Sequence, residues 1–79
     1  MRVRVLFFGP TADLVGKHEI EMQVVDDSCP GSIAAQLTAR HEGLRSRKLL
    51  FAVNEEYADD RTSLKDGDSV AIFTPVSGG

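Results

Sequence analysis

Cysteine and long apolar runs are scarce in this sequence, and each scarcity excludes a class of protein. The chain has 79 residues, one cysteine (Cys29) and no tryptophan. A single cysteine cannot form an internal disulfide, so a disulfide-stapled scaffold is excluded and a reducing compartment is expected. The longest fully apolar run, residues 49–53, is too short to cross a bilayer, and no signal-like apolar segment follows the first arginines. We therefore expect a cytoplasmic protein without membrane contact.

Positive charge is also in short supply. Nine Lys and Arg residues stand against twelve Asp and Glu residues, which gives a formal net charge of -3 at pH 7. A nucleic-acid binder that follows the phosphate backbone needs clustered basic residues, so we expect no nucleic-acid partner. Basic residues gather only at Arg45, Arg47 and Lys48. We expect these to form a solvated loop, with a docking patch for an acidic partner as the alternative.

Residues for metal binding or side-chain catalysis are few. The two histidines and the single cysteine do not have the spacing of a zinc site. Adjacent acidic residues such as Asp26 and Asp27 point apart on a strand or turn, so they indicate solvated turns and not acid/base pairs. No glycine-rich loop of the phosphate-binding kind is present. We expect no bound metal and no bound cofactor.

The apolar pattern that is present predicts one small α+β domain. A chain of this length cannot build two independent cores. Residues 2–8 alternate between polar and apolar, with Val3, Val5 and Phe7 on the predicted core face. Residues 18–25 resume the alternation, which predicts a second strand antiparallel to the first.

Helix-boundary residues predict a short helical turn and one longer helix. Thr11 is the candidate cap of a turn over residues 12–15, which Gly16 ends. Ser28 is the candidate cap of the longer helix, and Gly43 its candidate C-terminal cap. Apolar residues at helical spacing predict one stripe that packs on the sheet, formed by Ile33, Leu37 and Leu44.

The second half of the chain predicts a return to strands. Residues 49–54 read as a buried third strand, and residues 55–60 as a turn that leads into a short or irregular edge segment. Residues 65–68 have the composition of a tight turn. Residues 69–73 then alternate as a last strand, so the main order of elements is β, β, α, β, β.

The last five residues, Pro75-Val76-Ser77-Gly78-Gly79, leave the strand pattern. We expect residues 1–74 to form the domain and residues 75–79 a flexible tail. Glycines at the end let another protein's backbone approach closely, and they leave the terminal carboxylate of Gly79 unhindered toward a phosphoryl electrophile. Glycine-rich ends are also common in frayed termini, so this pair is a weak signal alone.

Several segments together carry a more specific signal, and their order along the chain is part of it. They are residues 5–9 (VLFFG), 14–16 (LVG), 52–54 (AVN), 64–71 (LKDGDSVA) and 75–79 (PVSGG). This set resembles the small subunits of molybdopterin synthases over nearly the whole chain. The chain departs from that family's pattern at Thr74, where a second proline is common, and in the Cys29-Pro30-Gly31 helix entry.

The resemblance implies a ubiquitin-like β-grasp fold, with a mixed sheet and one main helix packed on one face. It also implies that Gly79 carries first an adenylate and then a thiocarboxylate, with Gly78 giving access. The implied partners are an adenylating enzyme that uses ATP, a sulfur donor and the larger synthase subunit, which builds the dithiolene of the molybdenum cofactor. The isolated chain would then be a carrier subunit of a sulfurtransferase complex and not an enzyme.

Strand phase adds a docking surface for the larger subunit. Phe8 and Phe73 lie on strand faces opposite Val5 and Ile72, and exposed aromatic residues need a reason. The alternative is that these rings cover a second small core or the short helix at Leu14. The expected partner-binding residues are Phe8, Tyr57, Phe73, Pro75 and Val76.

Three other functions remain open at this point. The related sulfur carrier of thiamine synthesis tends to have a tight first hairpin, and the insert at residues 9–16 is an argument against it. A ubiquitin-like protein modifier would form isopeptide bonds through Gly79. A plain β-grasp interaction module would have an inert tail.

Overall fold

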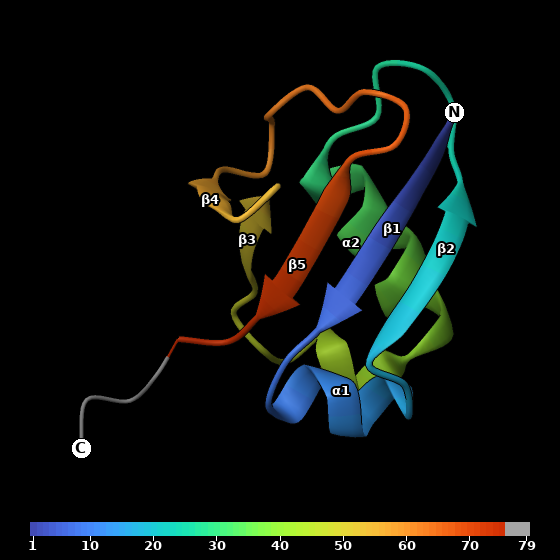
Figure 1. Cartoon of the computed structure of the whole chain (residues 1–79). Coiled ribbons are helices and arrows are strands. Elements are labelled where there is room, and N and C mark those ends of the chain that lie inside the picture. Colours follow the sequence, from blue (N-terminus) through green and yellow to red (C-terminus); the bar gives the residue numbers. More distant parts are fainter. Residues whose placement is uncertain (76–79) are drawn as a thin grey trace.

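The computed structural model describes residues 1–75, which form a five-stranded mixed sheet with one main helix against one face (Figure 1). The elements are β1 (Arg2–Phe7), α1 (Pro10–Val15), β2 (Glu19–Gln23), α2 (Pro30–Arg40), the 3-10 turn η1 (Glu42–Leu44), β3 (Leu50–Val53), β4 (Glu56–Ala58) and β5 (Ser69–Phe73). The strand order is β2-β1-β5-β3-β4, in which β1 and β5 are parallel and the other neighbours antiparallel. The predicted α+β class with one helix layer is confirmed.

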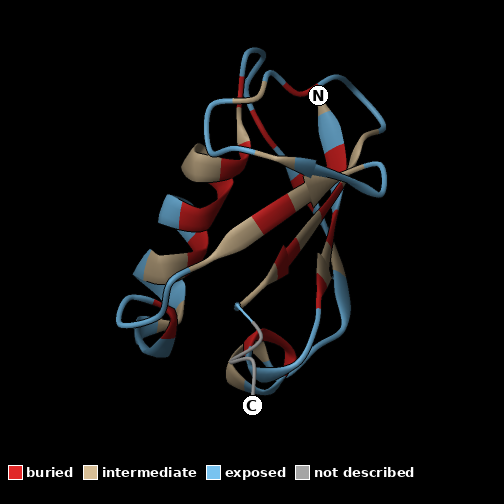
Figure 2. Ribbon diagram, turned by 90° about the vertical axis from the view of Figure 1, so that its left-hand side faces the viewer, coloured by how far each residue is buried: buried red, intermediate tan, exposed pale blue. Residues whose placement is uncertain are grey.

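The core lies between α2 and one face of the sheet. Figure 2 shows the sheet edge-on, with α2 along one side and buried residues between the two layers. Val3, Val5 and Phe7 are each 1% exposed or less, so the predicted core face of the first strand is confirmed. The same face of β5 contributes Val70 and Ile72, and α2 contributes Ile33 and Leu37. Each such side chain stabilises the fold by about 1.5–3 kcal/mol on burial.

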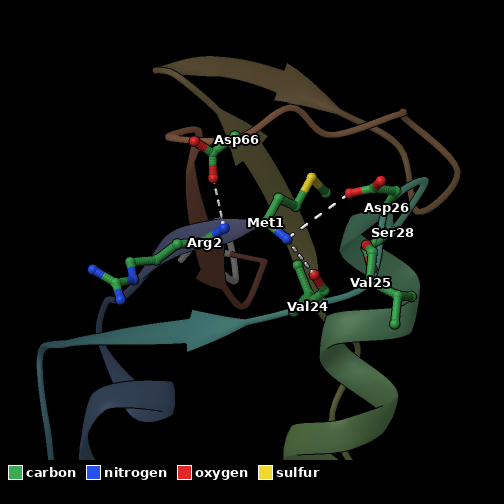
Figure 3. Close-up of polar contacts among 7 residues, drawn as sticks. All are labelled: Met1, Arg2, Val24, Val25, Asp26, Ser28 and Asp66. Atoms are coloured by element: carbon green, nitrogen blue, oxygen red, sulfur yellow. Dashed lines mark hydrogen bonds and ion pairs between the residues drawn. The ribbon is translucent and has the colours of Figure 1, made fainter.

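Hydrogen bonds at the start of β1 join it to the turn before β5 and to the end of β2. Figure 3 shows the Arg2 N–H donating to Asp66 Oδ1 at 2.7 Å, and the Met1 amino nitrogen donating to the Val24 carbonyl at 2.8 Å. Gly67, with φ of +87°, donates its N–H to the Arg2 carbonyl at 2.8 Å. The tight turn predicted over residues 65–68 is confirmed, and its hydrogen bonds join the start of β5 to β1.

The prediction that Thr11 caps the short helix α1 is wrong. The residue before α1 is Gly9, with φ of +58°, and Thr11 lies inside the helix, fully buried. Its hydroxyl oxygen accepts from the Phe8 N–H at 3.1 Å and lies 2.7 and 2.9 Å from the carbonyl oxygens of Phe8 and Ile72, which share its single proton. Since this hydroxyl bonds to Phe8, the residue after β1, and to Ile72 of β5, it links the ends of the two strands instead of capping the helix.

The prediction that Ser28 caps the longer helix α2 is also wrong, because the N-cap is the next residue. Cys29 is the N-cap of α2, and the Ser28 hydroxyl donates to the Val25 carbonyl at 2.6 Å. Pro30 occupies the first turn as predicted. The next residue, Gly31, donates its N–H to the Asp60 carbonyl at 2.9 Å, and a Cβ at this position would lie 2.8 Å from the same oxygen. The unusual helix entry is therefore a close backbone contact that requires glycine.

The C-terminal boundary of α2 differs from the prediction for a packing reason. The helix ends at Arg40 with His41 as its cap, and Gly43 lies in η1, so Gly43 does not cap α2. A Cβ at Gly43 would lie 2.7 Å from Leu14 Cδ2, which shows how tightly α1 packs on η1. Leu44 still belongs to the core, at 1% exposed.

The strand boundaries shift by one or two residues from those predicted. β1 ends at Phe7, and β2 is shorter than the predicted residues 18–25. The third strand is less buried than predicted, because only Phe51 of β3 is buried. The expected short or irregular edge segment is a short regular strand, β4, at one border of the sheet, and it lies within the residues predicted as a turn. Within residues 1–75, no helix is long and apolar enough to cross a membrane.

Candidate functional site

The face of the sheet opposite α2, here called the open face, carries the predicted docking residues. Strand register aligns Leu6 of β1 with Ala71 of β5, Ala71 with Ala52 of β3, and Ala52 with Tyr57 of β4. These four side chains share one face because aligned residues of neighbouring strands point to the same side. The row thus crosses four of the five strands, on the side of the sheet that α2 does not cover.

A hollow of about 750 Å³ lies along the open face, here called the open-face groove. Its middle has small side chains, Ala52 and Ala71, with the larger Leu6 and Tyr57 on either side of them in the same row. The residues that line it are Arg4, Leu6, Phe8, Ala52, Asn54, Glu55, Tyr57, Ser69, Ala71 and Phe73. Such a shape accepts a ridge of apolar side chains from another molecule.

The groove brings together the three aromatic residues that strand phase had selected. Phe8 is 53% exposed and Tyr57 is 86% exposed. The Tyr57 and Phe73 rings lie 5.9 Å apart between centroids, tilted by 56°, which is within the range of favourable aromatic pairs. Because Phe8 and Tyr57 keep more than half their surface in solvent, they do not cover a second core, and the alternative interpretation is wrong for these two rings.

The other end of the groove is polar, and it includes residues that the sequence analysis had not predicted to bind a partner. Arg4 is aligned with Ser69, and the Ser69 N–H donates to Asn54 Oδ1 at 3.0 Å. Asn54 and Glu55 form the turn between β3 and β4, with φ of 50° and 71°. Alternation along the first strand could have placed Arg4 here, but Asn54 and Glu55 depend on the pairing of β3 with β5.

The remaining predicted site residues lie at and beyond the end of β5. Pro75 is exposed and follows the strand by two residues, close in sequence to the Phe73 end of the groove. Val76, Gly78 and Gly79 lie outside the described residues. The predicted carrier group on Gly79 therefore remains a prediction.

A second hollow, of about 490 Å³, lies between α2 and the strands β3 and β4. Arg45 and Arg47 contribute to its lining, and both are exposed, as is Lys48. These residues lie exposed in a loop, as predicted, and the alternative of a docking patch for an acidic partner stays a prediction. Within residues 1–75, no group of three or more His, Cys, Asp or Glu side chains is placed to hold a metal ion.

Comparisons with known proteins agree on one family. The model of the ThiS family matches residues 5–79. A molybdopterin synthase sulfur carrier subunit from Chlamydomonas reinhardtii is 37% identical over 83 residues, which covers 100% of both chains. Small archaeal modifier protein 3 from Haloferax volcanii is 28% identical over 92 residues, again with 100% of both chains covered.

Solved structures extend the likeness to the fold. A structure of the complex of subunits 1 and 2 of the molybdopterin-converting factor from Helicobacter pylori contains a similar chain, with a TM-score of 0.69, 29% identity and 100% of both chains covered. A ubiquitin from Caldiarchaeum subterraneum has a TM-score of 0.63 at 15% identity, over 100% of this chain and 98% of that one. The second likeness concerns the fold alone, which is the expected ubiquitin-like β-grasp.

Proposed function

The chain belongs to the ThiS family, and from this premise we propose that it is the sulfur-carrier subunit of a molybdopterin synthase. The observation that carries the proposal is the full-length likeness to the algal sulfur carrier subunit. The likeness to a chain solved in complex with its subunit 2 supports a larger subunit as partner. The isolated chain is then a carrier, and the reaction belongs to the complex.

The proposed working group is the carboxylate of Gly79. A carboxylate is a poor electrophile, so an adenylating enzyme first joins it to the α-phosphate of ATP and releases pyrophosphate. A sulfur donor at the oxidation level of sulfide then attacks the acyl carbon and expels AMP, which leaves a thiocarboxylate. Its sulfur is a soft nucleophile at neutral pH, suited to attack a pterin precursor in the larger subunit. ATP thus acts at the activating enzyme and is not a cofactor of this chain.

The open-face groove is the proposed docking site for the larger subunit. Exposed aromatic rings in the middle of an interface are where binding energy concentrates. The three rings occupy one continuous groove, and β5 ends at Phe73, two residues before Pro75. Five extended residues reach about 18 Å, so a partner docked on this groove has the chain end within reach of a nearby active site. We include Pro75 and Val76 in the contact.

An intact-mass measurement tests the carrier function. The chain is incubated with an activating enzyme of the family, ATP and a sulfur donor, and its mass is recorded before and after. We expect the mass gain of one oxygen replaced by one sulfur, and none when ATP is omitted. A chain without Gly79 is the matched control, since it should unfold at the same temperature as the parent and gain nothing. An unchanged parent mass under conditions that load a known carrier would contradict the proposal.

Replacing Gly78 tests the requirement for a thin chain end. Gly78→Val adds a β-branched side chain next to the carrier residue and restricts its backbone. We expect product formation by the complex to fall more than its affinity falls. Gly78→Ala is the graded control, because it adds only one methyl group. Equal turnover of the Val variant and the parent would show that the end does not enter a narrow channel.

A protein modifier is the second candidate, and the 28% identity to the archaeal modifier protein favours it. In that case activated Gly79 would form isopeptide bonds with lysines of other proteins. Mass spectrometry of cell extracts after protease digestion would then reveal lysines that carry the chain's C-terminal residues. If the chain is loaded with sulfur but no such adducts are found, the carrier function is supported and the modifier function is contradicted.

A further inference from the structure

The open-face groove has a direction, because its charged and aromatic residues lie at opposite ends. Parallel pairing aligns Arg4 with Ser69 at one end of β1 and β5, while Phe8 and Phe73 follow at the other end of the same strands. The row of Leu6, Ala71, Ala52 and Tyr57 lies between these ends. We call the Arg4 end, with Asn54 and Glu55, the polar end of the groove.

Among residues 1–75, one charge at the polar end of the groove has no ion-pair partner. Arg4 Nε lies 3.3 Å from Glu19 Oε2, so the positive charge that lines the groove already has a partner on β2. Of the described residues that line the groove, only Glu55 is acidic, and it is exposed. Within residues 1–75, Glu55 takes part in no ion pair. The groove therefore offers an approaching molecule one uncompensated negative charge, at one end.

The backbone holds Glu55 in this place. A two-residue hairpin turn with positive φ at both positions favours Asn and Gly, and Glu55 adopts φ of 71° although it is neither. The turn is anchored by the preceding Asn54, whose Nδ2 donates to Asp68 Oδ1 at 2.9 Å while its Oδ1 accepts from the Ser69 N–H at 3.0 Å. These hydrogen bonds tie the turn between β3 and β4 to the start of β5. They fix the backbone of the turn, so Glu55 is held beside the groove.

The neighbouring glutamate gives a contrast. Glu56 is aligned with Val53 of β3, and Val53 with the core residue Val70 of β5, so Glu56 belongs to the opposite face of the sheet. Glu56 does not line the open-face groove. Glu55 and Glu56 therefore carry the same charge at adjacent positions but present it to different sides of β4.

We propose that the protein docked on the open-face groove places a basic side chain against Glu55, and that this pair sets the direction in which the partner lies along the groove. The proposal rests on the proposed function for the identity of the partner, the larger subunit. Apolar contacts in the middle of the groove provide affinity but little directional information. A single charge at one end distinguishes the correct orientation from the reversed one, since charge pairs across interfaces fix register and raise association rates.

Charge reversal at the two adjacent glutamates tests the proposal. Glu55→Lys and Glu56→Lys change the net charge equally, and binding of each to the purified larger subunit is measured by stopped-flow association and by calorimetry, at low and high salt. We expect Glu55→Lys to weaken the complex about tenfold or more at low salt, mainly through slower association, and the difference to shrink as salt rises. We expect Glu56→Lys to change the affinity by less than about twofold, as exposed charges usually do.

Outcomes for the two proposals can be told apart. Equal effects of the two reversals would overturn the pairing at Glu55, because they would reflect net charge alone. Unchanged binding by Glu55→Lys, with weakened binding by Phe73→Ala, would overturn the pairing and keep docking on the groove. Unchanged binding by both would overturn docking on this face. Glu55→Gln, which removes the charge and keeps the shape, should give an intermediate loss, and denaturant titration of each variant checks that the fold is intact.

Discussion

The two faces of one sheet use the same strands for different purposes. On the face toward α2, Phe7 is 1% exposed, whereas its neighbour Phe8, on the open face, is 53% exposed. Both are phenylalanines, and their exposed fractions differ because a single helix layer covers only one side of the sheet (Figure 2). An apolar side chain on a sheet therefore belongs either to a core or to an interface, depending on whether a helix layer covers its face.

The open face also differs from the core face in the size of its central residues. The core face has Val5 and Val70 side by side at 0% exposed, while the open face has Leu6 next to Ala71. Alanine leaves space in the middle of the open face, and this space is the groove. An uncovered face that is hollow and lined with aromatic rings is typical of a binding surface.

The largest expected effect comes from truncating the same residue type on either face. Phe7→Ala should lower the free energy of unfolding by about 3–5 kcal/mol, as truncations of buried phenylalanine do. Phe8→Ala should lower it by less than about 1 kcal/mol, because substitutions at exposed positions have small effects. Urea titration of both variants measures the difference. Similar losses for the two would mean that the open face is covered in solution.

The next effect concerns binding and not folding. Phe73→Ala should weaken the complex with the larger subunit by about 2 kcal/mol or more, as hot-spot truncations do. Its stability loss should stay below about 3–5 kcal/mol, the cost of truncating a fully buried phenylalanine, because Phe73 is only partly buried. Val25→Ala, at an apolar residue that is 78% exposed and outside the groove, is the control and should leave affinity unchanged. A large stability loss with unchanged affinity would place Phe73 in the core instead.

The smallest effect tests the turn that borders the polar end of the groove. Asn54→Ala should cost about 1–2 kcal/mol of stability, because it removes two side-chain hydrogen bonds and puts a residue with poor tolerance for positive φ at +50°. Asn54→Gly loses the same hydrogen bonds but accepts the backbone angle, so it should cost less. Thermal unfolding of both variants separates the two contributions. An Ala variant as stable as the Gly variant would show that the angle contributes nothing.

Much of this fold follows from local rules. Alternation along residues 2–8 identified Val3, Val5 and Phe7 as core residues, and all three are buried. The glycine and aspartates of residues 65–68 specified the tight turn. The helix caps were wrong at Thr11 and Gly43 because tertiary contacts use these residues for other purposes. The Thr11 hydroxyl bonds to β5, and Gly43 lets α1 pack on η1.

In the candidate site, too, some features follow from local sequence and others from the pairing of distant strands. Strand phase alone separated Phe8 and Phe73 from the core face, since the two-residue period of a strand is a local property. The meeting of Tyr57 with Phe73 at 5.9 Å, and of Asn54 with Ser69, depends on β3 pairing with both β4 and β5. Residues far apart in sequence become neighbours only when their strands bury one common core, and no local pattern contains that information. The strand period predicts from local sequence which side chains face away from the core, whereas their gathering into one groove with a charged and an aromatic end follows from the pairing of distant strands.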